Sequence, residues 1–172
     1  MPPPRLLSPA AIDDVLLYRL ARLTAVAGTV VVRLCEGVYG ITRREWRLVA
    51  LLAQEDGVLS SELAERARLD RARTSRAITS LAAKKLIQRQ VGGGDRRQAR
   101  IALTARGRTL YEELFPRVLE INRELLDALE PRQAAELDAT LDALQARADA
   151  ILARGGLPKA DRRRGRARAP LG

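Results

Sequence analysis

The sequence contains no histidine and only one cysteine, Cys35. A disulfide within the chain is therefore impossible, and a zinc site built from cysteine and histidine is excluded. Aromatic residues make up only 3% of the chain, whereas hydrophobic residues make up 47%. We therefore expect a core of aliphatic residues and alanine, with no metal and no cofactor.

Signals of membrane, secreted and enzymatic classes are also missing. No apolar run approaches the ~18 residues that a membrane span needs. The Pro-rich start lacks the apolar segment and cleavage site of a signal peptide, so we expect a cytoplasmic protein that does not bind membranes. The sequence has no nucleophile motif and no phosphate-binding glycine loop, so it does not predict an enzyme.

Positive charge is abundant and unevenly distributed. The net charge is +10, and residues 60–100 carry 11 basic and 4 acidic side chains. A basic middle segment is typical of a surface that binds a polyanion. A solvated arginine-rich face explains the same numbers, and charge alone does not decide between the two.

Helix signals mark the first third of the chain. Ser8 followed by proline predicts the start of a long helix within residues 8–36. Thr42 and Glu45 form a capping box, with Ile41 and Trp46 at the flanking staple positions, and predict a second helix to about Gln54.

Residues 60–103 predict a helix-turn-helix followed by a hairpin. Ser60 opens a short helix, and Asp70 caps a second helix, RARTSRAITSLAAKKLI, that is rich in arginine near its start. Two possible strands, residues 87–91 and 98–103, flank the segment GGGDRR. The three glycines suit the turn of a β-hairpin and allow its tip to enter a groove.

The last third predicts two long helices and a tail. One helix begins at Thr104 and ends near Leu129, and another extends from Pro131 to Arg154. The second carries apolar residues every 3.5 positions on average, which favours a seam between two chains over packing within one chain. These residues are Leu137, Leu141, Leu144, Ala148 and Ile151. Residues 155–172 form a basic tail that is predicted to be disordered. The tail either adds non-specific affinity for DNA phosphates or has no function, and the sequence does not decide between the two.

Three segments together resemble the MarR (multiple antibiotic resistance regulator) family of winged helix-turn-helix transcription factors. They are ITRREWRLVALLA, SSELAERARLDRARTSRAITSLAAKKLIQRQ and GGGDRRQARIALTARGRTLYEEL. The resemblance covers roughly residues 8–154 and implies a mainly α fold with a two- or three-stranded β wing. It divides the chain into a dimerisation helix (8–36), a winged helix-turn-helix domain (41–103) and C-terminal dimerisation helices (104–154). Lys85 departs from the pattern, because such proteins often have glycine after the recognition helix.

The helix after Asp70 and the hairpin tip supply the candidate DNA contacts. Arginine can bind guanine through two hydrogen bonds, and serine and threonine contact bases or phosphates. Arg76 is the first candidate for base reading, although any single arginine here can equally contact phosphate. We expect Arg97 in the minor groove, Arg96 on phosphate and Asp95 as the residue that orients the wing. The full recognition-helix set is Arg71, Arg73, Thr74, Ser75 and Arg76.

The resemblance also implies a homodimer on a pseudo-palindromic double-stranded DNA site and an effector that is a small anionic aromatic or acyl-CoA. Tyr18, Arg22 and Trp46 are candidates for an aromatic and cationic ligand site, but all three also suit structural roles. Cys35 is expected to be a small buried hydrophobe rather than a redox sensor, because it sits among apolar residues late in the first predicted helix. No obvious cation or partner cysteine is placed to lower its pKa.

The sequence therefore predicts a ligand-responsive transcriptional repressor. The alternative is a nucleoid-type architectural protein that binds DNA without sequence preference. A specificity ratio of ~10³ or more at fixed salt would separate the repressor from the architectural protein.

Overall fold

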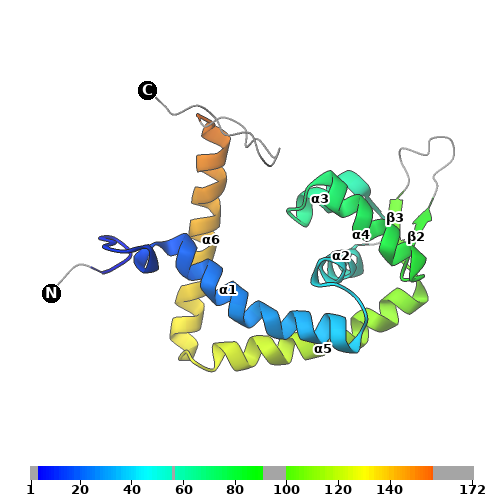
Figure 1. The fold of residues 1–172 in the computed structure, drawn as a ribbon, viewed down its shortest axis with the longest axis horizontal. Helices are drawn as coiled ribbons and strands as arrows, with labels where there is room; N and C mark the ends of the chain where they lie inside the picture. Colours follow the sequence, from blue (N-terminus) through cyan, green and yellow to red (C-terminus); the bar gives the residue numbers. More distant parts are fainter. Residues whose placement is uncertain (1–3, 56, 91–99, 157–172) are drawn as a thin grey trace. The chain divides into compact units, whose positions relative to one another are not determined.

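The computed structural model describes residues 4–55, 57–90 and 100–156, and the chain divides into two units, residues 1–127 and 128–172. The first unit holds five α-helices and a small sheet, and the second holds one helix (Figure 1). This mainly helical fold with a three-stranded sheet confirms the predicted fold class. The helices are α1 (Leu16–Arg33), α2 (Arg43–Gln54), α3 (Ser60–Arg66), α4 (Arg71–Ala83), α5 (Ala105–Leu126) and α6 (Pro131–Arg154).

The sheet consists of β1 (Val58–Leu59), β2 (Ile87–Gln90) and β3 (Arg100–Leu103), in the antiparallel order β1-β3-β2. Ile87 pairs with Leu103, and both are buried. The described strands are shorter than the predicted ones, because Val91, Gln98 and Ala99 lie outside the described residues. β1 was not predicted, since two residues are too few to show an alternating pattern.

The predicted start of the first helix is wrong. The chain forms a short 3-10 helix, η1 (Ile12–Asp14), before α1 begins at Leu16, and Ser8 caps neither. The Asp14 carboxylate instead accepts hydrogen bonds from the backbone N–H groups of Ala10 and Ala11. This local bonding satisfies the donors that a cap at Ser8 would otherwise serve, because aspartate competes well for nearby backbone donors. α1 continues into a π-helical turn, η2 (Leu34–Val38), that contains the buried Cys35.

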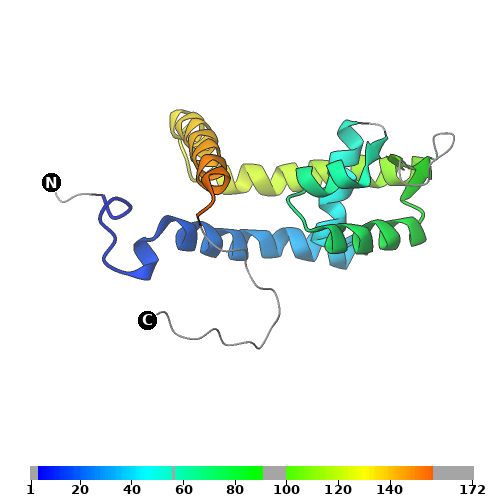
Figure 2. The same cartoon turned by 90° about the horizontal axis from the view of Figure 1, so that it is seen from above.

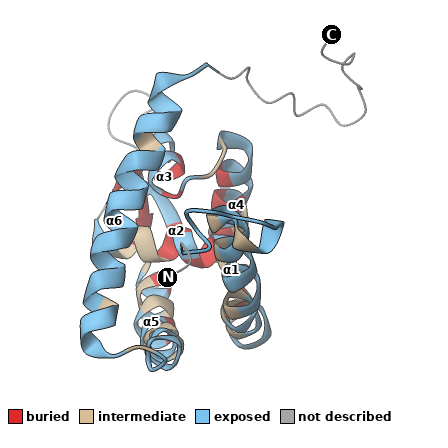
Figure 3. Ribbon diagram, turned by 90° about the vertical axis from the view of Figure 1, so that its left-hand side faces the viewer, coloured by how far each residue is buried: buried red, intermediate tan, exposed pale blue. Residues whose placement is uncertain are grey.

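The core gathers around α2, α3 and α4 (Figure 3). The predicted capping box is confirmed, because Thr42 accepts from the Glu45 N–H and the Glu45 carboxylate accepts from the Thr42 N–H. The staple residues Ile41 and Trp46 are both buried. Leu63 and Ala64 of α3 are buried as well, and so is Ala67 at its C-terminal end.

α1 and α5 run antiparallel and side by side in the first unit (Figures 1 and 2). Aromatic rings join α2 to α5: Trp46 stacks on Tyr111 with ring centroids 5.9 Å apart, and Tyr111 stacks on Phe115 at 5.1 Å. Trp46 therefore packs against α5 with most of its surface buried, as expected of a staple residue.

α6 begins with Pro131 at its first helical position and ends at Gly155, which has a positive φ. Neither α6 nor α1 buries any residue fully. Among the described helices, none is by itself long and apolar enough to cross a membrane. Only the bent pair of residues 16–38 and 43–54, with an angle of 87°, has the length and composition when taken together.

Candidate nucleic-acid interface

A tight turn between α3 and α4 sets the start of the arginine-bearing helix. Arg68 has a φ of 50°, and the backbone N–H of Leu69 donates to the carbonyl of Ala64 at 3.0 Å, which closes α3. Two residues later the Asp70 carboxylate accepts from the Arg73 N–H at 2.7 Å and caps α4. The predicted cap and the helix-turn-helix are therefore both present.

The outward face of α4 carries four of the five predicted recognition-helix residues. Arg71, Ser75 and Arg76 are exposed, and Arg73 is exposed but forms an ion pair with Asp70 at 3.2 Å. Thr79 is also exposed, one turn after Ser75, and its hydroxyl donates to the Ser75 carbonyl at 3.0 Å. Sequence reasoning missed Thr79, although its i+4 spacing from Ser75 places both on one side of the helix.

Thr74 does not belong to this face, so its prediction as a DNA contact is wrong. The residue is only 1% exposed, and its hydroxyl donates to the Asp70 carbonyl at 3.0 Å. A threonine at this position satisfies its own polar group within the helix, which allows it to pack in the core. Its neighbours in the sequence point outward because successive helix residues are rotated by about 100°.

The residues predicted for the wing tip (Asp95, Arg96 and Arg97) lie outside the described residues. The base of the hairpin is held by Arg100 of β3, which donates to the Gly57 carbonyl at 2.6 Å. Gly57 has a φ of +80°, a conformation that suits glycine, and it immediately precedes β1. This contact therefore anchors the hairpin to the end of the α2–β1 connection.

Lys85, which stands where similar proteins often have glycine, takes the left-handed conformation with a φ of 58°. Its N–H donates to the Ala82 carbonyl, and the Leu86 N–H donates to the Leu81 carbonyl. These two bonds form a Schellman motif that ends α4. The Lys85 side chain is exposed, so it does not compete for space in the core.

A buried carboxylate ties the end of α4 to the start of α2. Glu45 is 2% exposed, and its two oxygens accept from the Lys84 ammonium at 3.0 and 2.9 Å. Lys84 also donates to the Gly40 carbonyl at 2.9 Å. Burial raises the pKa of Glu45, but hydrogen bonds from Ser80, the Thr42 backbone and Lys84 outweigh it and hold the pKa below its usual value.

Replacing Glu45 with glutamine is expected to lower the free energy of unfolding by about 1–3 kcal/mol at pH 7, because hydrogen bonds to a charged group are lost. The pKa is lower in the folded chain than in the unfolded chain. The stabilisation is therefore present above about pH 4.5 and is lost as the pH falls through the folded pKa. Urea unfolding of both proteins from pH 7 to pH 3.5 measures this difference.

The matched control is Glu62→Gln. Glu62 occupies the equivalent position in α3, where its carboxylate accepts from the Leu59 N–H at 3.1 Å, but it is exposed. The control is expected to change stability less than Glu45→Gln. A gap between wild type and Glu45→Gln that stays constant down to pH 3.5 would contradict the role of the ionised carboxylate.

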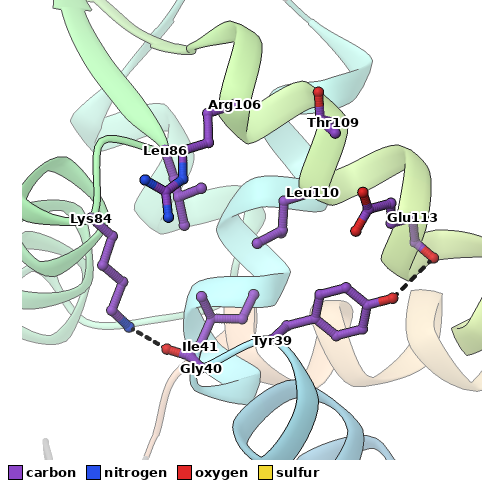
Figure 4. A pocket seen from close by; sticks show the side chains of 9 residues that line it. All are labelled: Tyr39, Gly40, Ile41, Lys84, Leu86, Arg106, Thr109, Leu110 and Glu113. Atoms are coloured by element: carbon purple, nitrogen blue, oxygen red, sulfur yellow. Dashed lines mark hydrogen bonds between the residues drawn. The ribbon is translucent and has the colours of Figure 1, made fainter.

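An open pocket of about 590 Å³ lies beside this ion pair (Figure 4). Lys84 and Arg106 supply positive charge to its wall, and Ile41, Leu86 and Leu110 supply an apolar surface. Tyr39, Gly40, Thr109 and Glu113 complete the lining, and the Tyr39 hydroxyl donates to the Glu113 carbonyl at 3.4 Å. This volume falls within the range of small-molecule sites. We call it the α4–α5 pocket.

The predicted ligand trio is not brought together within the described chain. Tyr18 and Arg22 lie in the first half of α1, and neither lines the α4–α5 pocket. Arg22 forms an ion pair with Asp13 at 2.8 Å. Trp46 lines a smaller pocket of about 300 Å³ together with Arg43 and Arg47. The aromatic and cationic pairing that the sequence suggested thus recurs at Trp46, with different arginines.

Cys35 is fully buried, and burial, followed by the charge of Glu36, raises the pKa of its thiol. A raised pKa and lack of access both disfavour thiolate chemistry, so the structure favours the small buried hydrophobe over the redox sensor.

The exposed arginine-bearing face of α4, the turn that starts it and the antiparallel strands beside it define a winged helix-turn-helix DNA-binding protein. The sequence profile of the MarR family matches residues 39–98, which include α3, α4 and β2 of this motif. The DNA-binding part of the chain is thus similar to that of MarR family transcriptional regulators.

Solved structures share the fold well beyond the matched segment. A MarR family transcriptional regulator from Silicibacter pomeroyi DSS-3 is 26% identical, with 80% of this chain and 97% of that chain covered and a TM-score of 0.69. A MarR/EmrR family transcriptional regulator from Acinetobacter sp. ADP1 is 25% identical, with 81% and 98% covered and a TM-score of 0.69. The transcriptional regulator SlyA is 20% identical with a TM-score of 0.71, which is a likeness of fold alone. No curated protein matches this chain.

Proposed function

We propose that this protein is a dimeric transcriptional repressor that binds a pseudo-palindromic DNA site and is released by a small anionic aromatic or aromatic acyl-CoA ligand. The observation that carries the proposal is the outward face of α4, where Arg71, Ser75 and Arg76 stand exposed at the start of a helix. Such a helix fits the major groove of B-DNA, in which each base pair presents a distinct pattern of donors and acceptors.

Within this face we assign base reading to Arg76 and phosphate contacts to Arg71 and Arg73. Ser75 and Thr79 extend the same side of α4 and can contact base edges or phosphates. From the wing we keep the assignments made on the sequence: Arg97 for the minor groove, Arg96 for phosphate and Asp95 for orienting them. These wing assignments rest on the motif alone.

Arg76→Ala is expected to weaken binding to the specific site by about 1–3 kcal/mol, or roughly 5- to 150-fold, and to relax preference at one base position. Loss of a paired guanine contact costs sequence-specific energy, whereas random DNA offers only phosphates. Titrations of specific and random duplexes at one salt concentration measure both effects.

Arg73→Ala is the matched control, because it removes the same charge from the same helix. Asp70 already engages the Arg73 guanidinium, so we expect a small and similar loss on both duplexes. Equal losses for Arg76→Ala on specific and random DNA would contradict base reading by Arg76.

The dimer is supported by apolar surface that one chain leaves uncovered. Contiguous exposed apolar surface marks an interaction site. In α1, Leu17, Leu23, Val26 and Val30 are exposed, and in α6 the predicted seam residues Leu137, Leu141, Leu144 and Ile151 are 37–53% exposed. A homodimer can cover these helices and place two recognition helices about 34 Å apart on DNA.

For the effector, the α4–α5 pocket is the better-supported site. It combines apolar walls with Lys84 and Arg106, the groups needed to hold the ring and carboxylate of an aromatic acid. It also includes the end of the recognition helix. The trio of Tyr18, Arg22 and Trp46 remains a prediction that requires the partner chain to join its members.

The deciding experiment is a titration of the DNA upstream of the protein's own gene against scrambled DNA at ~150 mM salt, followed by addition of aromatic acids and acyl-CoA thioesters. Preference of ~10³-fold or more, reversed by one compound, supports the ligand-responsive repressor. Equal binding to both duplexes supports the architectural alternative instead.

A further inference from the structure

The Lys84 ammonium has no donor to spare. A lysine ammonium carries three N–H donors. Three acceptors surround it: the Gly40 carbonyl at 2.9 Å and the two Glu45 oxygens at 3.0 and 2.9 Å. The same ammonium forms part of the wall of the α4–α5 pocket (Figure 4). An acid bound in the pocket can therefore bond to Lys84 only by displacing one of these acceptors.

One acceptor belongs to Gly40, which precedes α2, and the other two belong to Glu45 in the first turn of α2. Gly40 precedes the capping box of α2, and Glu45 completes that box by accepting from the Thr42 N–H at 2.6 Å. Lys84 is the C-terminal cap of α4. The Lys84 ammonium thus links the start of α2 to the end of the recognition helix.

We propose that Lys84 transmits occupancy of the α4–α5 pocket to the recognition helix, because a ligand carboxylate competes with Glu45 and Gly40 for its ammonium. Arg106, which is exposed on α5, provides the second cation for the same carboxylate. Ile41, Leu86 and Leu110 hold the apolar part of the ligand. The inference names the regulation of the proposed effector site and rests on the proposed function.

When the hydrogen bonds from Lys84 to Gly40 and Glu45 break, a small tilt of α4 displaces the far end of the helix most. The helix has 13 residues. At a rise of 1.5 Å per residue, Arg71 lies about 20 Å from Lys84, so a tilt of ~10° at the Lys84 end moves Arg71 by ~3 Å. Such a shift is as long as a hydrogen bond, and it removes base contacts made by the first turns of the helix.

The coupling must act in both directions. If an acid weakens operator binding by some factor, the operator weakens acid binding by the same factor. A factor of ~10–100 is typical of coupled sites. Glu45 and the bound acid compete for one cation. A weaker interaction between Glu45 and Lys84 therefore raises the affinity of the pocket for the acid.

The test uses the full-length protein with benzoate, 4-hydroxybenzoate and phenylacetate as probes and benzyl alcohol as the uncharged control. Calorimetry up to ~20 mM measures acid binding, and gel-shift titration measures operator affinity with and without acid. The variants are Lys84→Met, Glu45→Gln and Arg106→Met. Lys85→Met is the matched control, because it removes the neighbouring lysine, which does not line the pocket.

We expect at least one acid to bind the wild type and to weaken operator binding at least 10-fold, while benzyl alcohol does not. Lys84→Met and Arg106→Met should each weaken acid binding at least 10-fold, and Lys85→Met should change it less than 2-fold. Glu45→Gln should tighten acid binding by 3-fold or more while weakening operator binding. If the Glu45–Lys84 pair had a purely structural role, both Glu45→Gln and Lys84→Met would weaken acid binding.

The outcomes separate this inference from the proposed function. Equal acid binding by wild type, Lys84→Met and Arg106→Met overturns the inference, and acid release of a specific operator in the same experiment still supports the repressor. Weaker acid binding by Glu45→Gln also overturns the competition. Absence of binding by every acid overturns it as well, whereas loss of sequence preference on DNA overturns the proposed function. If Lys84→Met does not fold, the other two variants test the inference, because Glu45→Gln should tighten acid binding and Arg106→Met should weaken it.

Discussion

Replacing Leu141 and Leu144 together with glutamate is expected to convert the protein into monomers and to weaken operator binding by at least ~100-fold. Both leucines lie on the apolar stripe of α6, at 44% and 37% exposure in the single chain. In a dimer seam four added carboxylates would be desolvated and would repel one another, which a seam of leucines does not tolerate.

The loss of DNA affinity follows from the loss of the dimer. A monomer presents one recognition helix to one half-site and gives up the contacts at the second half-site. Sedimentation or light scattering at micromolar protein measures the association state, and gel-shift titration at ~150 mM salt measures the affinity. Because α6 buries no residue fully within its own chain, the monomer is expected to remain helical by circular dichroism.

Ala139→Glu with Ala146→Glu is the matched control, because it adds the same charge to the opposite face of α6. Both alanines are exposed, and their positions lie about half a turn from the stripe. We expect this control to stay dimeric. A dimer that survives the leucine substitutions would place the interface elsewhere on the chain and would show that the 3.5-residue repeat is only an amphipathic pattern.

Gly107→Ala is expected to lower the free energy of unfolding by about 3 kcal/mol and the melting temperature by roughly 6–12 °C. A β-carbon at Gly107 would lie 2.0 Å from the Leu86 carbonyl oxygen, which is backbone and cannot rotate away. That carbonyl already accepts from the Thr104 N–H at 3.1 Å, at the start of α5. Relief of the clash therefore separates the end of α4 from the start of α5.

Gly37→Ala is the control for the glycine substitution. No atom lies within 4 Å of a β-carbon there, and the glycine does not have a positive φ. We expect a change of less than about 0.5 kcal/mol, which is typical of a surface substitution away from special features. Chemical denaturation of the three proteins makes the comparison. Equal stability of Gly107→Ala and wild type would mean that the α4–α5 junction can open without cost.

The sequence predicted helix starts correctly where residues close in the sequence form the capping hydrogen bonds. The capping box of Thr42 and Glu45, the cap at Asp70 and the start of α5 at Thr104 all appear as predicted. Each depends on a hydrogen bond that spans three residues, so short-range spacing contains the whole signal. The same reasoning located the arginine-bearing helix α4.

Long-range packing decided the features that short spacing could not specify. Thr74 was predicted as a DNA contact, but the core against which α4 packs buries it. The Ser8 cap failed because Asp14 bonds the adjacent backbone. The three acceptors of Lys84 come from residues that are 39 to 44 positions away in the sequence. The pocket beside them also takes lining residues from α5.

The sequence by itself thus determined the order of the helices, the helix-turn-helix and the basic surface that points to nucleic acid. Periodicity and caps depend on residues within a turn or two of helix, and net charge depends only on composition. All three can therefore be obtained from the sequence alone. Only the tertiary structure decided which side of α4 faces outward and that a buried glutamate joins the end of that helix to α2. Those facts depend on which distant side chains meet, and burial then sets which polar groups must pair.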